Sequence, residues 1–232
     1  MVMRRRRIYV EIRICGEMEM LWKRTQDPAL HQRWDLRFSR IQYLPRPDEA
    51  QPQRFLYATR IGFGLEIRGE GESIASRTRA DGSRTSSLRF WSDAPLSLIR
   101  AGSGYWQYVP TDDGIRFITA YDYDVRFGAV GRAFDLLVFR PLIGWATAYS
   151  FDRLRLWIER DIEPARSLHL SFAQASVWGG VAVAGALSAL PRLRRPAALA
   201  PLVTVPLLGA YLSGRNAPSA RRCLRQPPEE RI

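Results

Sequence analysis

The sequence predicts an α+β fold in which a curved antiparallel sheet surrounds one long helix, followed by a two-helix hydrophobic hairpin. Three observations lead to this prediction. Residues 37–127 contain six short segments of strand character, separated by Gly, Pro or Asp turns. Residues 128–160 change to an apolar spacing of three and four, which is typical of a helix. After residue 166, two long stretches without Asp, Glu, Lys or Arg flank a short arginine-rich loop.

The elements before this hairpin follow a simple order. Residues 8–14 alternate apolar and charged side chains, which predicts a half-exposed strand. Residues 17–33 predict two short helices that break at Asp27-Pro28, because proline disfavours helical geometry in the residue before it. Six strands are then expected at 37–44, 53–61, 65–77, 84–92, 96–109 and 115–127, with the clearest hairpin turns at 80–83 and 111–114. The long helix at 128–160 is expected to kink or split at Pro141, because proline removes a helix hydrogen bond.

The alternation of side chains along these strands predicts which of them face the helix. The expected interior is rich in Tyr and Trp, which combine apolar area with a polar tip and suit a ligand with rings or a polar head. An interior that these aromatic side chains simply fill is the alternative. The candidate cavity residues are Trp34, Tyr57, Arg100, Trp106, Tyr108, Phe117, Thr119, Tyr121, Tyr123 and Phe134. Arg100 and Trp106 are an even number of residues apart on one expected strand, so they share a face. We expect Arg100 either to meet a ligand carboxylate or phenolate or to lie in solvent at the strand end, and we favour the second.

Three stretches of the sequence resemble a known superfamily. They are WKRTQDPALHQRWDLRFSRIQYLPR at 22–46, GSGYWQYVP with DGIRFITAYDY at 102–123, and FRPLIGWATAYSFDRLRLWIE at 139–159. Together with the element order and the Trp34-Asp35 pair, they look like START-like (SRPBCC, or helix-grip) proteins, which include polyketide cyclases and lipid-transfer proteins. The resemblance covers about residues 5 to 160 and implies a START-like domain at 1–164. It also implies a cavity between sheet and helix that takes a hydrophobic ligand.

No arrangement of residues points to catalysis, a metal or a cofactor. His31 is the one histidine within the predicted domain, and no nucleophile motif accompanies it. No His, Cys or carboxylate spacing suits zinc, and Cys15 and Cys223 lie at opposite ends of the chain. The GxG pairs at 62–64, 69–71 and 102–104 lack the helix of a dinucleotide site, so we interpret them as bends of a curved sheet.

The net charge of +12 invites a nucleic-acid interpretation, which the distribution of charge does not favour. Nearly all of the 35 basic residues are arginine, with Lys23 the one lysine. The arginines before residue 166 alternate with acidic residues and form no basic stripe, so we expect no nucleic-acid partner. Arg4–Arg7 is the exception, a dense run that is either a solvated tail or a contact for anionic head groups.

The hydrophobic hairpin predicts two transmembrane spans, at about 168–190 and 197–213. Small residues spaced by four within each segment permit close helix packing. More arginines flank the hairpin than occupy its loop, which predicts that both termini lie in the cytoplasm of a bacterium, at its inner membrane. The alternatives are one span, an interfacial hairpin, or two soluble helices. Residues 215–232 predict a basic, disordered tail.

The leading hypothesis from the sequence is therefore a membrane-anchored START-like domain that binds a lipid, quinone or polyketide-like molecule without covalent chemistry. One alternative is a polyketide cyclase/dehydrase-like enzyme in which Arg100, Tyr121 or Tyr123 polarises a carbonyl. Another is an interaction module with a solidly packed interior. The sequence does not fix an oligomeric state.

Overall fold

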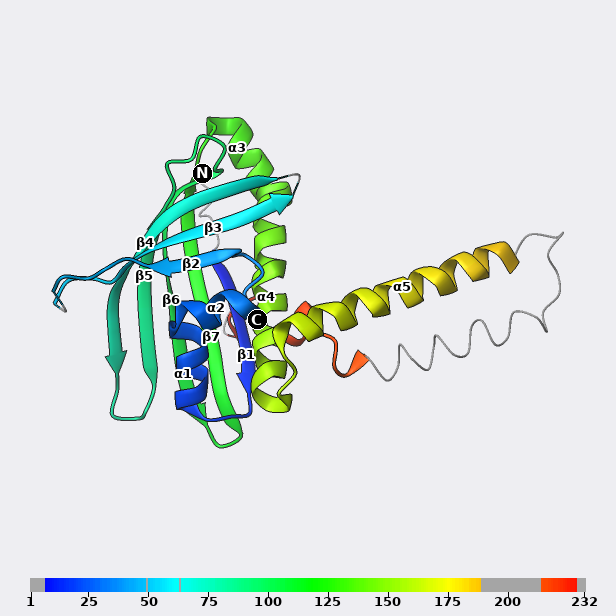
Figure 1. Cartoon of the computed structure of the whole chain (residues 1–232), viewed down its shortest axis with the longest axis horizontal. Helices are drawn as coiled ribbons and strands as arrows, with labels where there is room; N and C mark the ends of the chain where they lie inside the picture. The colour runs from blue at the N-terminus through cyan, green and yellow to red at the C-terminus, as the bar shows by residue number, and fades with distance from the viewer. Residues whose placement is uncertain (1–6, 49, 63, 189–213, 229–232) are drawn as a thin grey trace.

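Seven strands form one antiparallel sheet in the order β1-β7-β6-β5-β4-β3-β2. The computed structural model describes residues 7–48, 50–62, 64–188 and 214–228 (Figure 1). Its elements are β1 (Ile8–Ile14), α1 (Met18–Gln26), α2 (Pro28–Trp34), β2 (Arg40–Tyr43), β3 (Arg54–Gly62), β4 (Leu65–Thr78), β5 (Arg84–Trp91), β6 (Ile99–Thr111), β7 (Gly114–Val125), α3 (Gly128–Phe134), η1 (Asp135–Phe139), α4 (Arg140–Arg160), α5 (Pro164–Ser188) and η3 (Ala220–Arg222). The predicted order of one strand, two short helices, six strands and a long helix is confirmed.

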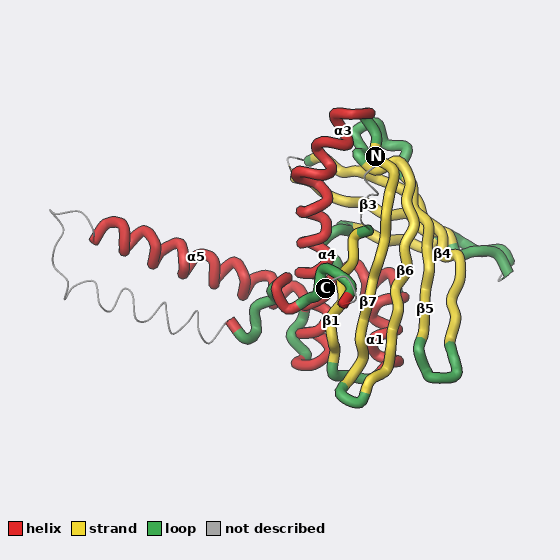
Figure 2. The backbone as a smooth tube through the Cα atoms, turned by 180° about the vertical axis from the view of Figure 1, so that it is seen from behind, coloured by secondary structure: helices red, strands yellow, loops and turns green. Residues whose placement is uncertain are grey.

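The sheet curves around α4, as the predicted α+β fold requires (Figure 2). The break between α1 and α2 falls at Asp27, whose side chain accepts hydrogen bonds from the N–H groups of Ala29 and Leu30 at 2.8 and 3.3 Å. Pro28 begins α2, where its missing N–H leaves no donor unsatisfied. Local sequence therefore sets this corner before any tertiary contact forms.

The long helix is divided where the sequence predicts a kink or split. Pro141 lies in the first turn of α4, and a five-residue π-helical turn, η1, precedes it. Because a π turn holds an extra residue, it rotates α3 relative to α4 around their common axis. Asp135 of η1 is fully buried and accepts hydrogen bonds from the Tyr123 hydroxyl at 2.6 Å and from Arg140 Nε at 3.0 Å. This ion pair fixes the start of α4 against β7.

The helix α5 extends away from the sheet domain (Figure 1). Its first turns are attached to α4, since Ser167 is fully buried and the Tyr149 hydroxyl donates to Ser171 Oγ at 2.6 Å. Farther along, Phe172 and Trp178 are exposed. No helix within the described ranges is both long and apolar enough to cross a membrane, which does not support the span predicted at 168–190. The span predicted at 197–213 lies outside the described residues.

Residues 214–228 pack on the domain, in place of the expected disordered tail. Asp152 of α4 is fully buried and accepts hydrogen bonds from the Ser219 N–H at 2.8 Å and from Arg222 Nη1 at 2.6 Å. Leu224 exchanges two backbone hydrogen bonds of 2.9 Å with Glu11, at the free edge of β1. A buried carboxylate requires partners, and Asp152 finds two of them in this segment. The basic composition of the tail therefore serves docking on the domain.

Candidate ligand-binding site

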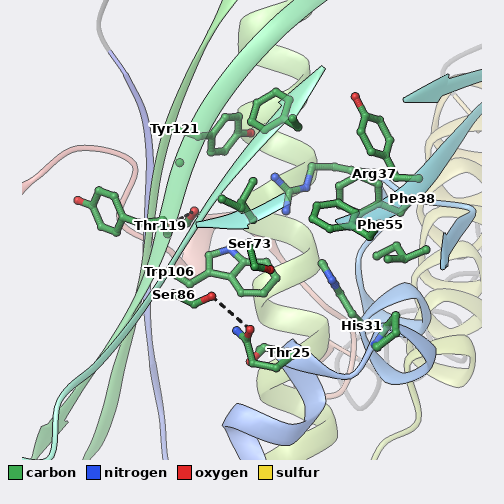
Figure 3. Close-up of a pocket in the computed structure, with 18 of the residues that line it drawn as sticks. Thr25, His31, Arg37, Phe38, Phe55, Ser73, Ser86, Trp106, Thr119 and Tyr121 are labelled. Atoms are coloured by element: carbon green, nitrogen blue, oxygen red, sulfur yellow. Dashed lines mark hydrogen bonds between the residues drawn. The ribbon is translucent and has the colours of Figure 1, made fainter. Parts of the chain in front are cut away.

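A cavity of about 150 Å³ lies between the sheet and the helices (Figure 3). Its walls combine aromatic and aliphatic side chains with a few polar groups, and all but one strand of the sheet, β1, contribute to them. The lining residues are Thr25, Gln26, Pro28, His31, Arg37, Phe38, Ile41, Tyr43, Phe55, Tyr57, Thr59, Ser73, Ser86, Leu88, Phe90, Ile99, Gly104, Tyr105, Trp106, Thr119, Tyr121 and Ile143. An apolar cavity with a small number of polar groups is the usual form of a small-molecule site.

Four of the ten candidate residues from the sequence line this cavity: Tyr57, Trp106, Thr119 and Tyr121. The hydroxyl of Tyr121 shares a hydrogen bond of 2.8 Å with Thr147 Oγ1 of α4. The hydroxyl of Tyr57 donates to the Trp91 carbonyl at 3.2 Å. Both tyrosines therefore direct a ring face or edge at the cavity while their hydroxyl groups are engaged in the wall.

Four other candidate residues are buried outside the cavity. Trp34, Tyr108 and Phe117 are fully buried in the core, and the Tyr108 hydroxyl is engaged by Thr25 Oγ1 at 2.7 Å and by Gln26 Nε2 at 2.9 Å. Tyr123 is buried as well, and its hydroxyl donates to Asp135. Burial raises the pKa of Tyr123, and the neighbouring Asp135 carboxylate raises it further, so this hydroxyl stays protonated.

The remaining two candidates lie outside the interior, each for an identifiable reason. The side chain of Arg100 is 65% exposed and pairs with Asp124 at 3.4 Å. The pairing of β6 with β7 shifts register between Ile99 and Ala101, so this bulge turns Ile99 into the cavity and Arg100 out of it. Phe134 is 50% exposed, because the π turn after it rotates α3 away from the face expected for a continuous helix.

Glycines on one strand make room for the aromatic walls on the next. A Cβ at Gly69 would lie 2.3 Å from the Tyr57 ring and 2.5 Å from the Trp91 carbonyl oxygen. A Cβ at Gly71 would lie 2.3 Å from the ring of Phe55. The rings therefore lie flat across the sheet and leave the centre of the cavity open. The GxG pair at 69–71 serves this close approach, whereas the register shifts of β4 occur elsewhere, at Arg60/Gly62 and Ser73/Ala75.

A polar cluster of His31, Asp35 and Arg37 stands at one end of the cavity. Asp35 is fully buried, and it accepts hydrogen bonds from Arg37 Nε at 2.9 Å and Arg37 Nη2 at 2.6 Å. His31 Nε2 lies 3.0 Å from Asp35 Oδ2. The His31 ring also stacks on Trp34 at 4.9 Å and meets the edge of Trp106 at 4.8 Å. Two of the three members, His31 and Arg37, line the cavity.

The charges of this cluster follow from its burial and its bidentate pair. Burial by itself raises the pKa of Asp35, but the Arg37 guanidinium and its hydrogen bonds outweigh burial and hold that pKa well below its usual range. Burial lowers the pKa of His31, and the hydrogen bond that His31 donates to Asp35 offsets only part of that shift. Near neutral pH the cluster therefore holds a carboxylate, a guanidinium and an uncharged imidazole.

The sequence offers a weak signal for this cluster. His31 stands out only as the one histidine of the predicted domain, without a nucleophile motif, and Arg37 is the first residue of an expected strand. The structure starts β2 at Arg40, so Arg37 and Phe38 belong to the loop that crosses the cavity end. The alternation of acidic and basic residues in Asp35-Leu36-Arg37 is the one local indication of a bidentate ion pair.

Comparison with curated proteins identifies one relative of the chain. No protein-family model matches the chain. Over 165 residues, 71% of its length, the chain is 51% identical to the uncharacterized membrane protein YndG of Bacillus subtilis (strain 168). It spans 61% of the length of that protein, which is less than two thirds.

Several solved structures resemble the domain. A hypothetical protein from Helicobacter pylori has a TM-score of 0.50 at 15% identity, over 65% of this chain and 85% of that one. A STAR-related lipid transfer protein from Xanthomonas axonopodis has a TM-score of 0.49 at 17% identity, over 65% of this chain and 84% of that one. The Zhui aromatase/cyclase of a Streptomyces species has a TM-score of 0.46 at 12% identity, over 65% of this chain and 96% of that one. At these identities the likeness concerns the fold alone.

Proposed function

We propose that the chain is a membrane-associated START-like domain that binds a small, ring-bearing hydrophobic molecule without covalent chemistry. The observation that carries this proposal is the cavity between the sheet and α4, with its aromatic walls and its single buried ion pair. A volume of about 150 Å³ suits a molecule of one or two rings, since an engineered apolar cavity of about this size holds benzene. Among a lipid, a quinone and a polyketide-like compound, this size favours a ring over a long acyl chain.

The geometry gives less support to the enzymatic alternative. Arg100 is exposed and paired with Asp124, and the Tyr123 hydroxyl donates to the buried Asp135. Tyr121 does line the cavity, but its hydroxyl is engaged by Thr147. None of the three side chains expected to polarise a carbonyl thus offers a free polar group to the cavity. The alternative of an interaction module requires a filled interior, which the cavity disfavours.

Two observations support the association with a membrane. The described part of α5 after Ser167 carries no charged residue and exposes Phe172, Trp178 and Val183, and an apolar surface of this kind favours a lipid or protein environment over water. The relative YndG is named as a membrane protein. The basic run Arg4–Arg7 would add attraction to anionic head groups.

The attachment points of the hydrophobic segment support an arrangement in which it leaves and returns on one side of the bilayer. The chain departs from α4 near Ser171 and is back on α4 at Ser219 and Arg222. Since both points belong to one folded domain, the chain between them crosses a bilayer an even number of times or lies along its surface. A single span is therefore disfavoured, and a cytoplasmic domain with both termini on its side is the arrangement we propose.

Mass spectrometry of small molecules that co-purify with the full chain tests the binding proposal. The control is Leu88→Trp, which fills part of the cavity from β5 with a larger side chain. We expect a ring-bearing hydrophobic molecule in extracts of the natural chain and a loss of most of it from the variant. Identical extracts from two folded proteins would contradict the proposal.

Alkaline carbonate washing of cell membranes tests the membrane proposal separately. Carbonate strips proteins held by charge alone, so a chain held by apolar segments stays in the pellet. We expect the full chain to remain in the membrane fraction. Complete release into the supernatant would overturn the anchor and leave the ligand proposal intact.

A further inference from the structure

At the polar end of the cavity, the carboxylate of Asp35 holds two side chains that can meet a ligand, the imidazole of His31 and the guanidinium of Arg37. His31 and Arg37 both bind Asp35, with His31 Nε2 at 3.0 Å and Arg37 Nη2 at 2.6 Å from Oδ2. Figure 3 shows the Arg37 guanidinium directed toward Tyr121 and the His31 ring beside Trp106, and all four residues line the cavity. Because they share one oxygen atom, the imidazole and the guanidinium are held close to each other.

The chemistry of the carboxylate fixes the tautomer of His31. An ionised Asp35 only accepts hydrogen bonds, so the proton of the neutral imidazole resides on Nε2. Nδ1 is then an acceptor, and it makes no hydrogen bond to the described part of the chain. Since His31 lines the cavity, this acceptor is open to a hydrogen-bond donor on a ligand.

Arg37 supplies the complementary donors. Its guanidinium carries five N–H groups, and Asp35 accepts from the Nε and Nη2 atoms. Tyr121 is a further hydrogen-bond partner of this guanidinium, and its ring centre lies 5.5 Å from Arg37 Cζ. The guanidinium keeps N–H groups beyond those that Asp35 and Tyr121 engage. The Arg37–Asp35 pair is neutral as a whole, so it does not favour a charged ligand over an uncharged one.

We infer that this end of the cavity recognises the hydroxyl group of an uncharged hydroxylated aromatic ring. The ligand hydroxyl donates to His31 Nδ1, and its oxygen accepts from Arg37. A hydroxyl is the simplest group that meets an acceptor and a donor at once, and the ring behind it meets Trp106 and Phe38, which line the cavity on either side of His31. This inference rests on the proposed function, because it names the class of ligand for the same cavity.

Binding of 2-naphthol, 2-methoxynaphthalene and naphthalene to the full chain tests the inference, with tryptophan fluorescence or calorimetry as the measurement. The methoxy compound keeps the ring and the oxygen but loses the donor. We expect 2-naphthol to bind about tenfold more tightly than 2-methoxynaphthalene, which corresponds to one hydrogen bond in a half-buried site.

Two variants assign the preference to His31. His31→Phe keeps an aromatic ring beside Trp34 but has no acceptor, and we expect the preference to fall to within about twofold while naphthalene still binds. His31→Gln keeps an N–H for Asp35 and a carbonyl acceptor, and we expect it to retain part of the preference. It also serves if His31→Phe fails to fold.

The outcomes separate this inference from the function on which it rests. Equal binding of 2-naphthol and 2-methoxynaphthalene by the natural chain would overturn the inference and leave the aromatic cavity in place. A preference that survives in folded His31→Phe would also overturn it. If none of the three compounds binds, the proposed function itself fails.

Discussion

The interior between the sheet and α4 is filled at one end and hollow at the other, although both ends are aromatic. At the filled end, Phe117 of β7 stacks on Phe151 of α4 with ring centres 4.4 Å apart, and Tyr108 packs on Phe117 at 5.0 Å. At the hollow end, α4 offers Ile143 to a cavity walled by Tyr57 and its neighbours. Both ends are rich in aromatic rings, so the number of rings does not explain the cavity. The two ends differ in how the rings are oriented and in which side chains they contact.

The glycines of β4 explain part of this difference. At the hollow end, the rings of Phe55 and Tyr57 lie against Gly71 and Gly69 on the next strand. A ring that covers a glycine lies along the sheet and does not reach α4. At the filled end, Phe117 reaches Phe151 and closes the space. The cavity therefore lies where large side chains turn sideways on the sheet.

The largest effect is expected from Phe151→Ala at the filled end. Phe151 is fully buried, so its truncation leaves a cavity and lowers the free energy of unfolding by about 3–5 kcal/mol. Ile143→Ala, beside the existing cavity, is the control and is expected to lower it by no more than about 2 kcal/mol, the low end of the range for this change, because Ile143 is only partly buried. Urea denaturation of the full chain measures both. Equal losses would mean that the two ends do not differ in packing.

A smaller effect is expected from Gly69→Ala at the hollow end. The new Cβ would lie 2.5 Å from the Trp91 carbonyl oxygen, so the strands must shift, which destabilises the domain by about 1–3 kcal/mol. Gly180→Ala on α5 is the control, because nothing lies within 4 Å of its Cβ position. Thermal unfolding measures both variants. A domain unaffected by Gly69→Ala would show that close contact of Tyr57 with the sheet is not needed.

The pH dependence of stability distinguishes the polar cluster from the apolar filled end. Burial lowers the pKa of His31, so below pH of about 6.5 the unfolded chain binds a proton that the folded domain does not. The stability that the neutral His31 imidazole contributes is fully present above that pH. It falls as the pH drops toward the pKa of His31 in the folded domain, by up to about 1.4 kcal/mol per pH unit. Urea midpoints between pH 7.5 and 5 measure this slope. His31→Gln is expected to remove this slope, and a slope unchanged in that folded variant would contradict the prediction.

The smallest effect is expected at Arg100, on the outer surface of the hollow end. Its pair with Asp124 is exposed on both sides, and exposed ion pairs contribute little. Arg100→Ala should change the free energy of unfolding by no more than about 0.5 kcal/mol and leave the affinity for 2-naphthol unchanged. A clear loss of affinity for 2-naphthol in Arg100→Ala would indicate that Arg100 contacts the ligand after all.

Much of the fold follows from local patterns in the sequence. The break at Asp27-Pro28, the six strands and the division of the long helix at Pro141 each depend on turn chemistry or periodicity within a few residues. The alternation of β7 separates interior from exterior in the same way, with Phe117, Thr119 and Tyr121 on the inside. These features need no knowledge of the partner elements.

The division of the interior into core and cavity does not follow from such patterns. Phe117 and Tyr121 have the same parity on β7, and only the side chains that α4 places opposite them decide that the first is packed and the second lines the cavity. One bulged residue reverses the parity of β6 and turns Arg100 outward. The ion pair of Asp35 and Arg37 depends on a loop where a strand is expected.

The docked segment 214–228 has a consequence for biogenesis. The outer edge of β1 is paired by Leu224, and the buried carboxylate of Asp152, which already pairs with Arg155 of α4, gains Arg222 as a second partner. Both contacts require residues that follow the uncharged stretches. During translation, the uncharged stretches are therefore synthesised before Leu224 can pair with the outer edge of β1. Completion of the folded domain is thereby tied to the synthesis of the segment that precedes residues 214–228.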